Sequence, residues 1–282
     1  MCGIAGAVGA IDDDVVQAVA RMSDAQAHRG PDQSGLWSST SGGRGVSLGH
    51  RRLSILDLSE AGRQPMHHPS GCVIVFNGEV YNFAALRDEL ALAELASGTD
   101  TEVILAAYVR WGERAIARMR GMFALAIFDP RSETVLFARD RLGIKPLYLA
   151  EQGGVLLFAS EVRALLASGR LERRLDPRSV ETFLWHGFVP GPRTIVEGVR
   201  LLPAGTSMRV GLDGRAREPR RYWQLPRASA HDEERSVRAL GEALLASVRL
   251  RLVADVPLGV FASGGVDSSA VAALAQRASG GP

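Results

Sequence analysis

The residues with the clearest chemical potential stand at the start of the chain, in the stretch MCGIAG. Cys2 follows Met1 directly, and removal of Met1 would give this cysteine a free α-amine. An α-amine has a reference pKa of about 7.7–8.0, so a useful fraction is neutral near pH 7 and can take the thiol proton. Cys2 is therefore a candidate nucleophile, and the alternative is an incidental small residue in an edge strand.

A second candidate site lies near the other end, in the stretch SGGVDSS at residues 263–269. Its glycines let backbone N–H groups approach an anion, and the helix expected to follow adds its positive end. Its serines add hydroxyl donors. No Walker A sequence occurs in the chain, so this would be a phosphate loop of another type. The alternative is a plain turn between a strand and a helix.

Other reactive side chains give weaker signals. The histidines His28, His50, His67 and His68 lack the spacing of metal ligands, and no metal site is expected. Cys72 lies within an apolar run and is expected to be a small buried residue. Lys145, in GIKPLY, is expected to be structural.

The elements that would position Cys2 alternate between short strands and helices. Residues 2–8 predict a buried strand, and residues 12–30 predict a helix with an acidic start and apolar spacing near 3.6. Residues 72–76 predict a strand that ends in a hairpin turn at Asn77-Gly78. The remaining expectations are helices at 82–96 and 99–119, the latter capped by Asp100 or Thr101, a strand hairpin at 121–143, and a strand entering a helix at 154–166. This order indicates an α+β layered domain.

The texture changes after about Arg209. Residues 210–234 are polar and basic, contain prolines and predict a solvated linker. An amphipathic helix at 232–252 follows, then a strand at 256–262, the glycine turn and a helix at 270–278. A strand followed by a helix is half of a βαβ unit.

Composition excludes several classes of protein. The 282 residues carry a formal net charge of +2, too small to argue for nucleic acid or an anionic membrane. No apolar run reaches the roughly 20 residues that cross a bilayer, and the start lacks the features of a signal peptide. Two cysteines do not make a disulfide framework, so a reducing cytoplasm is expected.

The ordered motifs carry a family resemblance. CGIAG, HRGPD, RLSI, FNGEVYN and DTEVIL together resemble class II glutamine amidotransferases, which are N-terminal-nucleophile enzymes. RDRLGIKPLY, FASEVRAL, LPAG, YW and VPLGVFASGGVDSS narrow the likeness to glutamine-hydrolysing asparagine synthetases. SGGVDSS is similar to the pyrophosphate loop of ATP pyrophosphatases. The resemblance implies an αββα glutaminase domain over residues 1–213. Residues 214–282 would be a linker and the incomplete start of an α/β ATP-pyrophosphatase (adenine nucleotide α-hydrolase-like) domain.

The resemblance also implies roles for individual residues. Cys2 would attack the side-chain amide of glutamine, while the Asn77 amide and the Gly78 N–H would stabilise the oxyanion. Arg52 would clamp the α-carboxylate, Glu79 and Asp100 would hold the α-ammonium, and backbone contacts would come from Ile55 and Leu56. The alternative interpretations are a surface arginine for Arg52, an acidic turn residue for Glu79 and a helix cap for Asp100. The implied ATP set is Ala262, Ser263, Gly264, Gly265, Asp267 and Ser268.

Substrates and partners follow from the same likeness. Complete family members use glutamine, aspartate and ATP with Mg²⁺, whereas glutaminase activity needs no cofactor. Their synthetase domain is several times longer than residues 214–282, so this chain alone is expected to release ammonia from glutamine without making asparagine. A homodimer, or a second chain supplying the missing domain, fits the family. The alternatives are a β-lactam synthetase, a lasso-peptide cyclase or a non-catalytic partner module.

Overall fold

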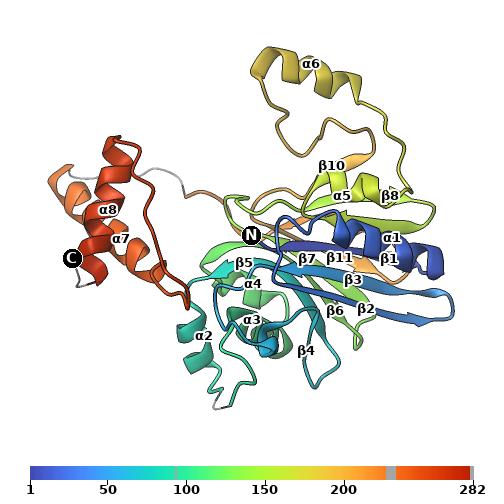
Figure 1. Ribbon diagram of the computed structural model, residues 1–282, viewed down its shortest axis with the longest axis horizontal. Helices are drawn as coiled ribbons and strands as arrows, with labels where there is room; N and C mark the ends of the chain where they lie inside the picture. Colours follow the sequence, from blue (N-terminus) through green and yellow to red (C-terminus); the bar gives the residue numbers. More distant parts are fainter. Residues whose placement is uncertain (93, 227–232, 280–282) are drawn as a thin grey trace. The chain divides into compact units, whose positions relative to one another are not determined.

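The computed structural model describes residues 1–92, 94–226 and 233–279. The chain divides into two compact units, shown in Figure 1. The first unit comprises Met1–Ser54 and Ser59–Gln224, and the second comprises Ile55–Leu58 and Leu225–Pro282. The first part of the stretch 210–234, expected to be a solvated linker, packs with the first unit instead, because Val210 is fully buried and Arg220–Arg221 form strand β12. Residues 227–232 of this stretch lie outside the described residues.

The first unit contains two six-stranded sheets whose paired strands are antiparallel. One sheet has the order β10-β8-β9-β1-β3-β2 and the other β12-β11-β7-β6-β5-β4. The strands of the first sheet are β1 (Gly3–Ala10), β2 (Gln33–Ser41), β3 (Arg44–Arg52), β8 (Tyr148–Gln152), β9 (Val155–Ala159) and β10 (Val199–Leu201). Those of the second are β4 (Met66–His67), β5 (Val73–Val80), β6 (Gly121–Asp129), β7 (Thr134–Arg139), β11 (Thr206–Gly211) and β12 (Arg220–Arg221).

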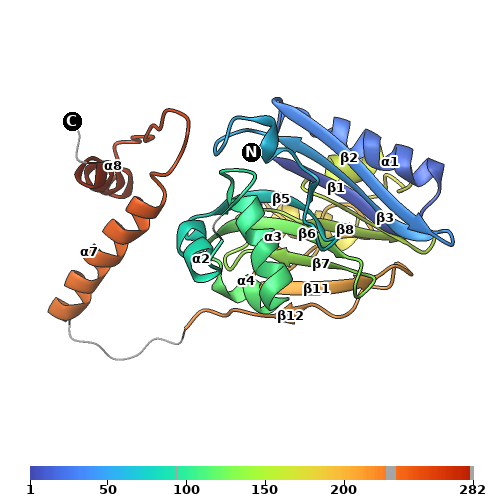
Figure 2. The ribbon, with the colours of Figure 1, turned by 90° about the horizontal axis from the view of Figure 1, so that it is seen from below.

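Helices cover the outer faces of the two sheets, as Figures 1 and 2 show. Against the first sheet pack α1 (Asp13–Asp24) and α5 (Val162–Ala167). Against the second pack α2 (Phe83–Glu89), α3 (Asp100–Trp111) and α4 (Arg114–Arg118). The unit also contains a short 3₁₀ turn, η1 (Glu60–Gly62), and α6 (Pro177–His186). The expected α+β, αββα architecture is confirmed.

The inner faces of the sheets form one apolar core. Ile4 and Val8 of β1 lie in the same buried cluster as Val73 and Val75 of β5. Side chains of a strand alternate between its two faces, which explains why every second residue of these strands enters this core. Each fully buried valine or isoleucine contributes about 1.5–3 kcal/mol relative to exposure, so this core fixes both sheets and their ends.

The helix expected at 12–30 is shorter than predicted but begins where its sequence indicates. The carboxylate of Asp12 accepts a hydrogen bond from Val15 N at 2.8 Å and caps α1. The region expected as one helix at 99–119 divides into α3 and α4, because Gly112 has φ 60° and ends α3. The helix expected at 82–96 is confirmed only over Phe83–Glu89.

The predicted hairpin turn at Asn77-Gly78 is wrong. β5 continues through both residues to Val80 and pairs with β6, with Gly78 opposite Phe123. A Cβ on Gly78 would lie 2.3 Å from Met122 O. The glycine is therefore required by the close approach of β6, and not by a turn.

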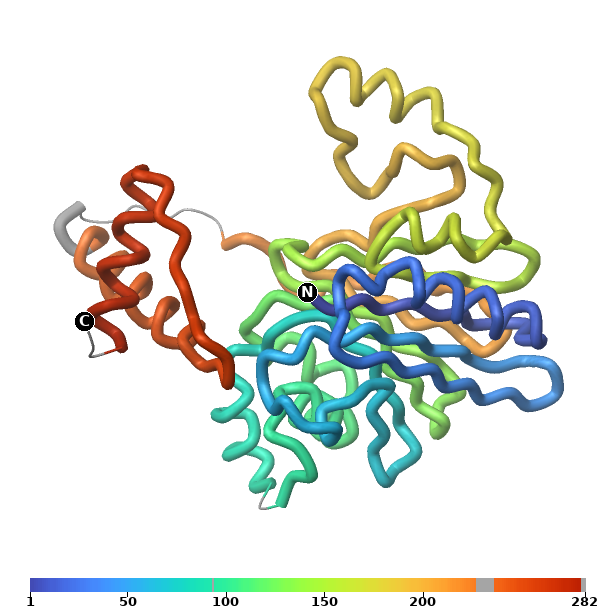
Figure 3. Tube along the Cα trace, in the orientation of Figure 1, coloured from blue at the N-terminus to red at the C-terminus, as the bar shows by residue number. Residues whose placement is uncertain are grey.

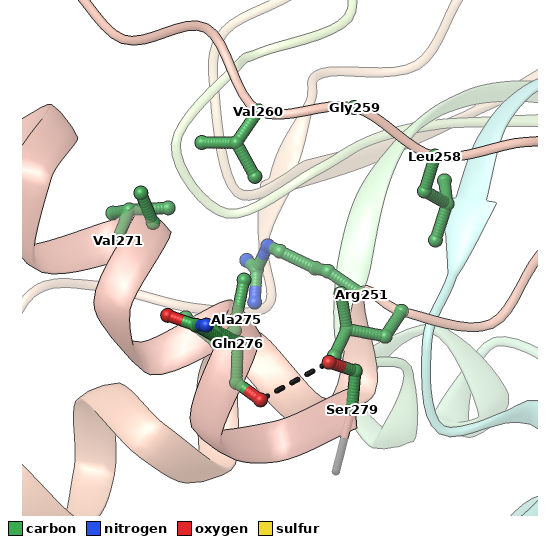
Figure 4. A pocket seen from close by; sticks show the side chains of 11 residues that line it. Arg251, Leu258, Gly259, Val260, Val271, Ala275, Gln276 and Ser279 are labelled. Atoms are coloured by element: carbon green, nitrogen blue, oxygen red, sulfur yellow. Dashed lines mark hydrogen bonds between the residues drawn. The ribbon is translucent and has the colours of Figure 1, made fainter. Parts of the chain in front are cut away.

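The second unit contains two helices, α7 (Glu233–Leu250) and α8 (Val266–Ser279), which pack on each other. With the segment 258–260 they line an apolar pocket of about 570 Å³. Figure 4 shows Leu258, Val260 and Val271 around it. The helices expected at 232–252 and 270–278 are confirmed, although Asp232 lies outside the described residues.

The strand predicted at 256–262 does not form. These residues run as irregular chain before α8, and Figure 3 follows their path. Phe261 is 98% exposed. A strand of a parallel sheet needs hydrogen-bonding neighbours and cover on both faces, and the described part of this unit contributes two helices and no other strand.

Candidate active site

Cys2 lies one residue before β1. Its Sγ accepts a hydrogen bond from Leu53 N at 3.4 Å and lies 3.7 Å from Leu53 O. The backbone carbonyl of Cys2 accepts from Arg29 Nε at 2.8 Å, so the residue is held from two sides. Burial raises the pKa of the Cys2 thiol, while the Leu53 hydrogen bond and the adjacent α-amine of Met1 lower it. A base or a nearby cation is therefore needed to form the thiolate at neutral pH.

Strand alternation brings Cys2 and Asn77 to the space between the sheets. Ile4 faces the inter-sheet core, so Cys2, two residues earlier in the extended chain, points to the same side. Val75 faces this core from β5, so Asn77 and then Glu79 follow on its face. β1 and β5 contact each other, and the N-terminus lies beside β5 in Figures 1 and 2.

The side-chain amide of Asn77 is buried, at 1% exposure, and is unsatisfied. Neither its Nδ2 nor its Oδ1 has a hydrogen-bond partner among the described residues. Burying an amide without partners is unfavourable by about 1–3 kcal/mol, so such a group in a core requires an explanation. A donor reserved for a ligand oxygen provides one.

The N–H of Gly78 lies on an edge of β5 that carries side-chain acceptors. Phe76 N donates to Gln64 Oε1 at 2.7 Å, and Val80 N donates to Asp100 Oδ2 at 2.7 Å. Alternate N–H groups of a strand point to the same edge, so the Gly78 N–H lies between these two. The Asn77 amide and the Gly78 N–H are thus two donors one residue apart.

Arg52 ends β3 and is buried, at 4% exposure. Its Nη1 donates to Gln33 Oε1 at 2.8 Å and to Ser59 O at 3.0 Å. A Cβ on Gly62 would lie 2.0 Å from Arg52 Nη2, so Gly62 leaves room for the guanidinium. The positive charge of Arg52 lowers the pKa of the Cys2 thiol. The alternative interpretation of Arg52 as a surface arginine is wrong.

Glu79, which is half-buried, and Asp100, which is buried, form an acidic pair. Burial and then the charge of Asp100 raise the pKa of Glu79 to about 8. Burial raises the pKa of Asp100 to about 7, although the hydrogen bond that its carboxylate accepts from Val80 N lowers this pKa. The predicted capping role of Asp100 is wrong, because Thr99 is the N-cap of α3 and the Asp100 carboxylate reaches back to β5. Two carboxylates held together out of water favour a cation between them.

His50 is a structural link between the sheets. It is fully buried, and its Nε2 lies 3.0 Å from Phe76 O on β5, which makes Nε2 the protonated nitrogen. Burial lowers the pKa of His50 to about 4, so its ring is neutral near pH 7. This contact gives His50 a structural role.

Arg29 is the residue near Cys2 to which the sequence patterns assign no role. It lies in the HRGPD stretch, and its Nη1 pairs with Glu161 Oε1 at 3.0 Å while its Nε holds the Cys2 carbonyl. The HRGPD motif was the sequence signal that could have indicated this role. It puts an arginine between the first helix and a glycine-proline turn, from where its side chain can reach the start of the first strand.

Ile55 and Leu56 belong to the second unit and are described within it. Ile55 O accepts a hydrogen bond from Asp255 N at 2.9 Å, and Leu56 is buried. Their backbone contacts with glutamine stay a prediction.

The predicted ATP loop follows the irregular segment and leads into α8. Ser263 Oγ lies 3.0 Å from Ser268 Oγ, which donates to Gly265 O at 3.1 Å. Gly264 has φ 79°, a conformation that favours glycine. Asp267 lies in the first turn of α8, and Ala262 and the glycines are exposed. The loop is at a helix N-terminus as expected, and its binding of ATP stays a prediction.

Metal binding and membrane insertion are the two remaining properties of the described residues. No group of three or more His, Cys, Asp or Glu side chains there is placed to hold a metal ion. In the same residues, no helix has the length and apolarity needed to span a bilayer.

Comparison with known proteins gives the class of the first unit. A sequence profile of the glutamine amidotransferase domain matches residues 1–223, and a profile of asparagine synthase matches residues 239–282. The chain has the fold of a glutamine phosphoribosylpyrophosphate amidotransferase from B. subtilis, with a TM-score of 0.60 at 16% identity over all of this chain and 65% of that one. The chain belongs to the glutamine amidotransferase family.

Sequence relatives give the type within the family. A putative glutamine-hydrolyzing asparagine synthetase of Mycobacterium tuberculosis is 39% identical over 98% of this chain and 46% of that protein. A putative glutamine-hydrolyzing asparagine synthetase of Methanocaldococcus jannaschii is 35% identical over 96% of this chain and 56% of that protein. Asparagine synthetase 3 of Bacillus subtilis is 36% identical over 98% of this chain and 45% of that protein. The domain is of asparagine synthetase type, in a ligase family, and the alternatives are not favoured. The chain spans about half the length of these relatives.

Proposed function

We propose that this protein hydrolyses glutamine to glutamate and ammonia, with Cys2 as the nucleophile after removal of Met1. One observation carries the proposal. The buried Asn77 amide has no partner among the described residues, and it faces the same inter-sheet space as Cys2. An unsatisfied buried donor beside a nucleophile is what stabilisation of a developing oxyanion requires.

The proposed reaction uses groups of this chain alone. The α-amine of Cys2 takes the thiol proton, and the thiolate attacks the side-chain carbonyl carbon of glutamine. The carbonyl electrons move to oxygen, where Asn77 Nδ2 and the Gly78 N–H donate. The α-ammonium of Cys2 then gives this proton to the side-chain amide nitrogen of glutamine. Ammonia departs, and the acyl group stays on Cys2 as a thioester. Water then cleaves the thioester, giving glutamate and the free thiol.

Recognition of the amino acid would use the charged groups around Cys2. The planar guanidinium of Arg52 suits the α-carboxylate. The α-ammonium would enter between Glu79 and Asp100, and its charge would lower the pKa of both carboxyls. Glutamine binding would therefore remove a repulsion that the free site contains.

The residues after the glutaminase domain, 214–282, are proposed as the opening of an ATP-binding domain. Ala262, Ser263, Gly264, Gly265, Asp267 and Ser268 would contact the pyrophosphate of ATP, with Mg²⁺ entering as part of that substrate. In the complete family enzyme, ammonia would convert ATP-activated aspartate to asparagine, AMP and pyrophosphate. We expect these 282 residues alone to form no AMP from aspartate and ATP, because residues 256–262 do not form a strand.

The setting is proposed to be cytoplasmic. A homodimer, or a second chain that completes the ATP domain, is proposed as the assembly. Sedimentation of the purified chain, alone and with a full-length asparagine synthetase, distinguishes these assemblies.

Glutamate release from glutamine tests the proposed activity. Cys2→Ala should abolish release, because no other group described in the site can form the thioester. Cys72→Ala is the matched control, since Cys72 is fully buried in β-sheet surroundings and has no role in the reaction. It should retain activity. Release that survives Cys2→Ala would contradict the proposed nucleophile.

A further inference from the structure

Lys145 is the only lysine in a chain with 33 lysine and arginine residues. It lies in the loop between β7 and β8, and it is 5% exposed. Elsewhere the chain uses the planar, strongly delocalised guanidinium of arginine. A lysine supplies a compact ammonium whose positive charge is concentrated on one atom.

The ammonium of Lys145 has no direct partner in the described part of the chain. Its backbone N donates to Asp140 Oδ2 at 2.9 Å, and its backbone O accepts from Arg139 Nε at 2.8 Å. No hydrogen bond or ion pair is made by its Nζ among the described residues. Because Lys145 as a whole is nearly buried, its charge is less well solvated than that of a surface lysine, and an anion nearby would stabilise it.

The loop that carries Lys145 is fixed by two buried side chains. The Asp140 carboxylate also accepts from Leu142 N at 3.1 Å and Ile144 N at 3.0 Å. Arg139 also donates to Gly143 O at 2.6 Å. Lys145 therefore leaves a backbone whose position is determined by several hydrogen bonds.

The same loop is attached to the strand opposite the proposed oxyanion donors. Phe123 on β6 pairs with Gly78, and Phe123 N donates to Asp140 Oδ2 at 3.1 Å. Asp140 N in turn donates to Phe123 O at 2.8 Å. One strand separates Gly78 from the loop, which places Lys145 beside the candidate site.

The charges that act on Lys145 are those of the candidate site. Burial and then Arg29 lower the pKa of Lys145, while Cys2, Glu79 and Asp140 raise it. Lys145 in turn lowers the pKa of Glu79 and of the α-amine at the chain start.

Several other charged groups around Cys2 make hydrogen bonds or ion pairs. Arg29 pairs with Glu161, and Arg52 donates to Gln33 and Ser59. Asp32 accepts from Ser54 N at 2.8 Å, and Asp100 accepts from Val80 N. In contrast to Arg29 and Arg52, Lys145 makes no hydrogen bond or ion pair through its charged group with the described residues.

We propose that Lys145 is a positioning residue whose ammonium acts through space to keep the Cys2 sulfur in its thiolate form. The inference rests on the proposed function, because it assigns Lys145 to the same nucleophile. Lys145 keeps its own proton throughout. The thiol proton passes to the Cys2 α-amine and later to the departing ammonia, while the fixed positive charge favours first the thiolate and then the oxyanion formed from it.

Alkylation of Cys2 by iodoacetamide at a series of pH values tests this in the full chain with Cys72→Ala as background. The neutral reagent reacts with the thiolate, so the midpoint of the rate profile reports thiol ionisation without glutamine. Lys145→Met should raise the midpoint by about one pH unit and lower kcat/KM for glutamine by about tenfold to a hundredfold, with KM little changed. Lys145→Arg keeps the positive charge, so its midpoint should lie much closer to that of the parent protein than to that of Lys145→Met.

Ile144→Met is the matched control in the same loop, because Ile144 is 54% exposed. It should leave the midpoint unchanged. If Lys145→Met leaves both the midpoint and kcat/KM within about twofold of the parent, the inference is wrong and Lys145 is structural. If instead the parent protein releases no glutamate while the midpoint shift is observed, the proposed function fails and the charge coupling stands.

A second measurement needs no variant at this position. Protein grown with [ε-¹³C]lysine gives one resonance, because the chain has one lysine. Its chemical shift should move as the Cys2 thiol ionises, and this step should disappear after alkylation of Cys2. A titration curve that alkylation leaves unchanged would overturn the inference even if Lys145→Met does not fold.

Discussion

The two candidate sites of this chain are built on opposite principles. In the first unit, Asn77 and Asp100 are at most 5% exposed. Asn77 is held in β5 by its pairing with β6, and Asp100 lies in α3 with its carboxylate bound by Val80 N. In the second unit, Phe261 is 98% exposed beside a loop of glycines and serines. Both sites carry clear motifs. A motif specifies which groups are present, whereas the sheets around it determine whether these groups are already positioned.

The largest effect should come from removing the unsatisfied donor. Asn77→Leu should lower kcat for glutamine hydrolysis by about 10²–10³-fold, the usual loss of one oxyanion donor. Thermal stability should stay equal or rise, because leucine has a similar shape and removes a buried amide that has no partner. Steady-state kinetics and thermal denaturation together check this.

Asn82→Ala is the matched amide control. Asn82 Oδ1 accepts from Arg120 N at 2.7 Å and its Nδ2 donates to Arg118 O at 3.0 Å, so this change should lower stability by about 1–2 kcal/mol and leave kcat nearly unchanged. The reverse pattern, stability lost at Asn77 and activity lost at Asn82, would contradict the assignment.

A pH-dependent effect should follow from the acidic pair. The pKa values of Glu79 and Asp100 are raised to about 8 and about 7, so the folded protein retains protons that the unfolded chain has released. Stability should therefore fall as pH rises from about 4 to about 8. Glu79→Gln should raise Tm by about 2–4 °C at pH 8 and by little at pH 5, corresponding to about 1 kcal/mol.

The exposed Glu172→Gln controls for the loss of a carboxylate and should change stability by less than about 0.5 kcal/mol at either pH. Equal stabilisation by Glu79→Gln at both pH values would rule out repulsion in the pair as its cause. The same variant should raise KM for glutamine, because one partner of the α-ammonium is lost.

The smallest effects should be found in the second unit. Phe261→Ser should change stability by less than about 0.5 kcal/mol, since this side chain is almost fully exposed. Asp267→Asn should leave glutamine hydrolysis within about twofold of the parent. A large loss of stability in Phe261→Ser, seen by thermal denaturation, would show that this region packs far more closely than the comparison states.

Local signals predicted the elements whose ends depend on neighbouring residues. Asp12 caps α1, and the alternation around residues 121–139 gives β6 and β7. The site residues could be proposed from the motifs alone, because Cys2, Arg52, Asn77 and Asp100 occur in recognisable stretches. Their burial could not.

Tertiary contacts decided the features that were predicted wrongly. Asn77-Gly78 has the composition of a turn, but the close approach of Met122 O requires a glycine within a strand. Asp100 has the sequence position of a helix cap, but its carboxylate instead accepts a hydrogen bond from Val80 N. The pairing of Glu79 with Asp100 and the burial of Lys145 depend on sheet register, which short-range patterns do not determine.

The mass of the chain after reaction with a diazoketone analogue of glutamine tests the central claim most directly. Met1 should be absent, and peptide mass spectrometry should find a single adduct, on Cys2. A chain that retains Met1, or an adduct on another residue, would contradict a nucleophile whose base is its own α-amine.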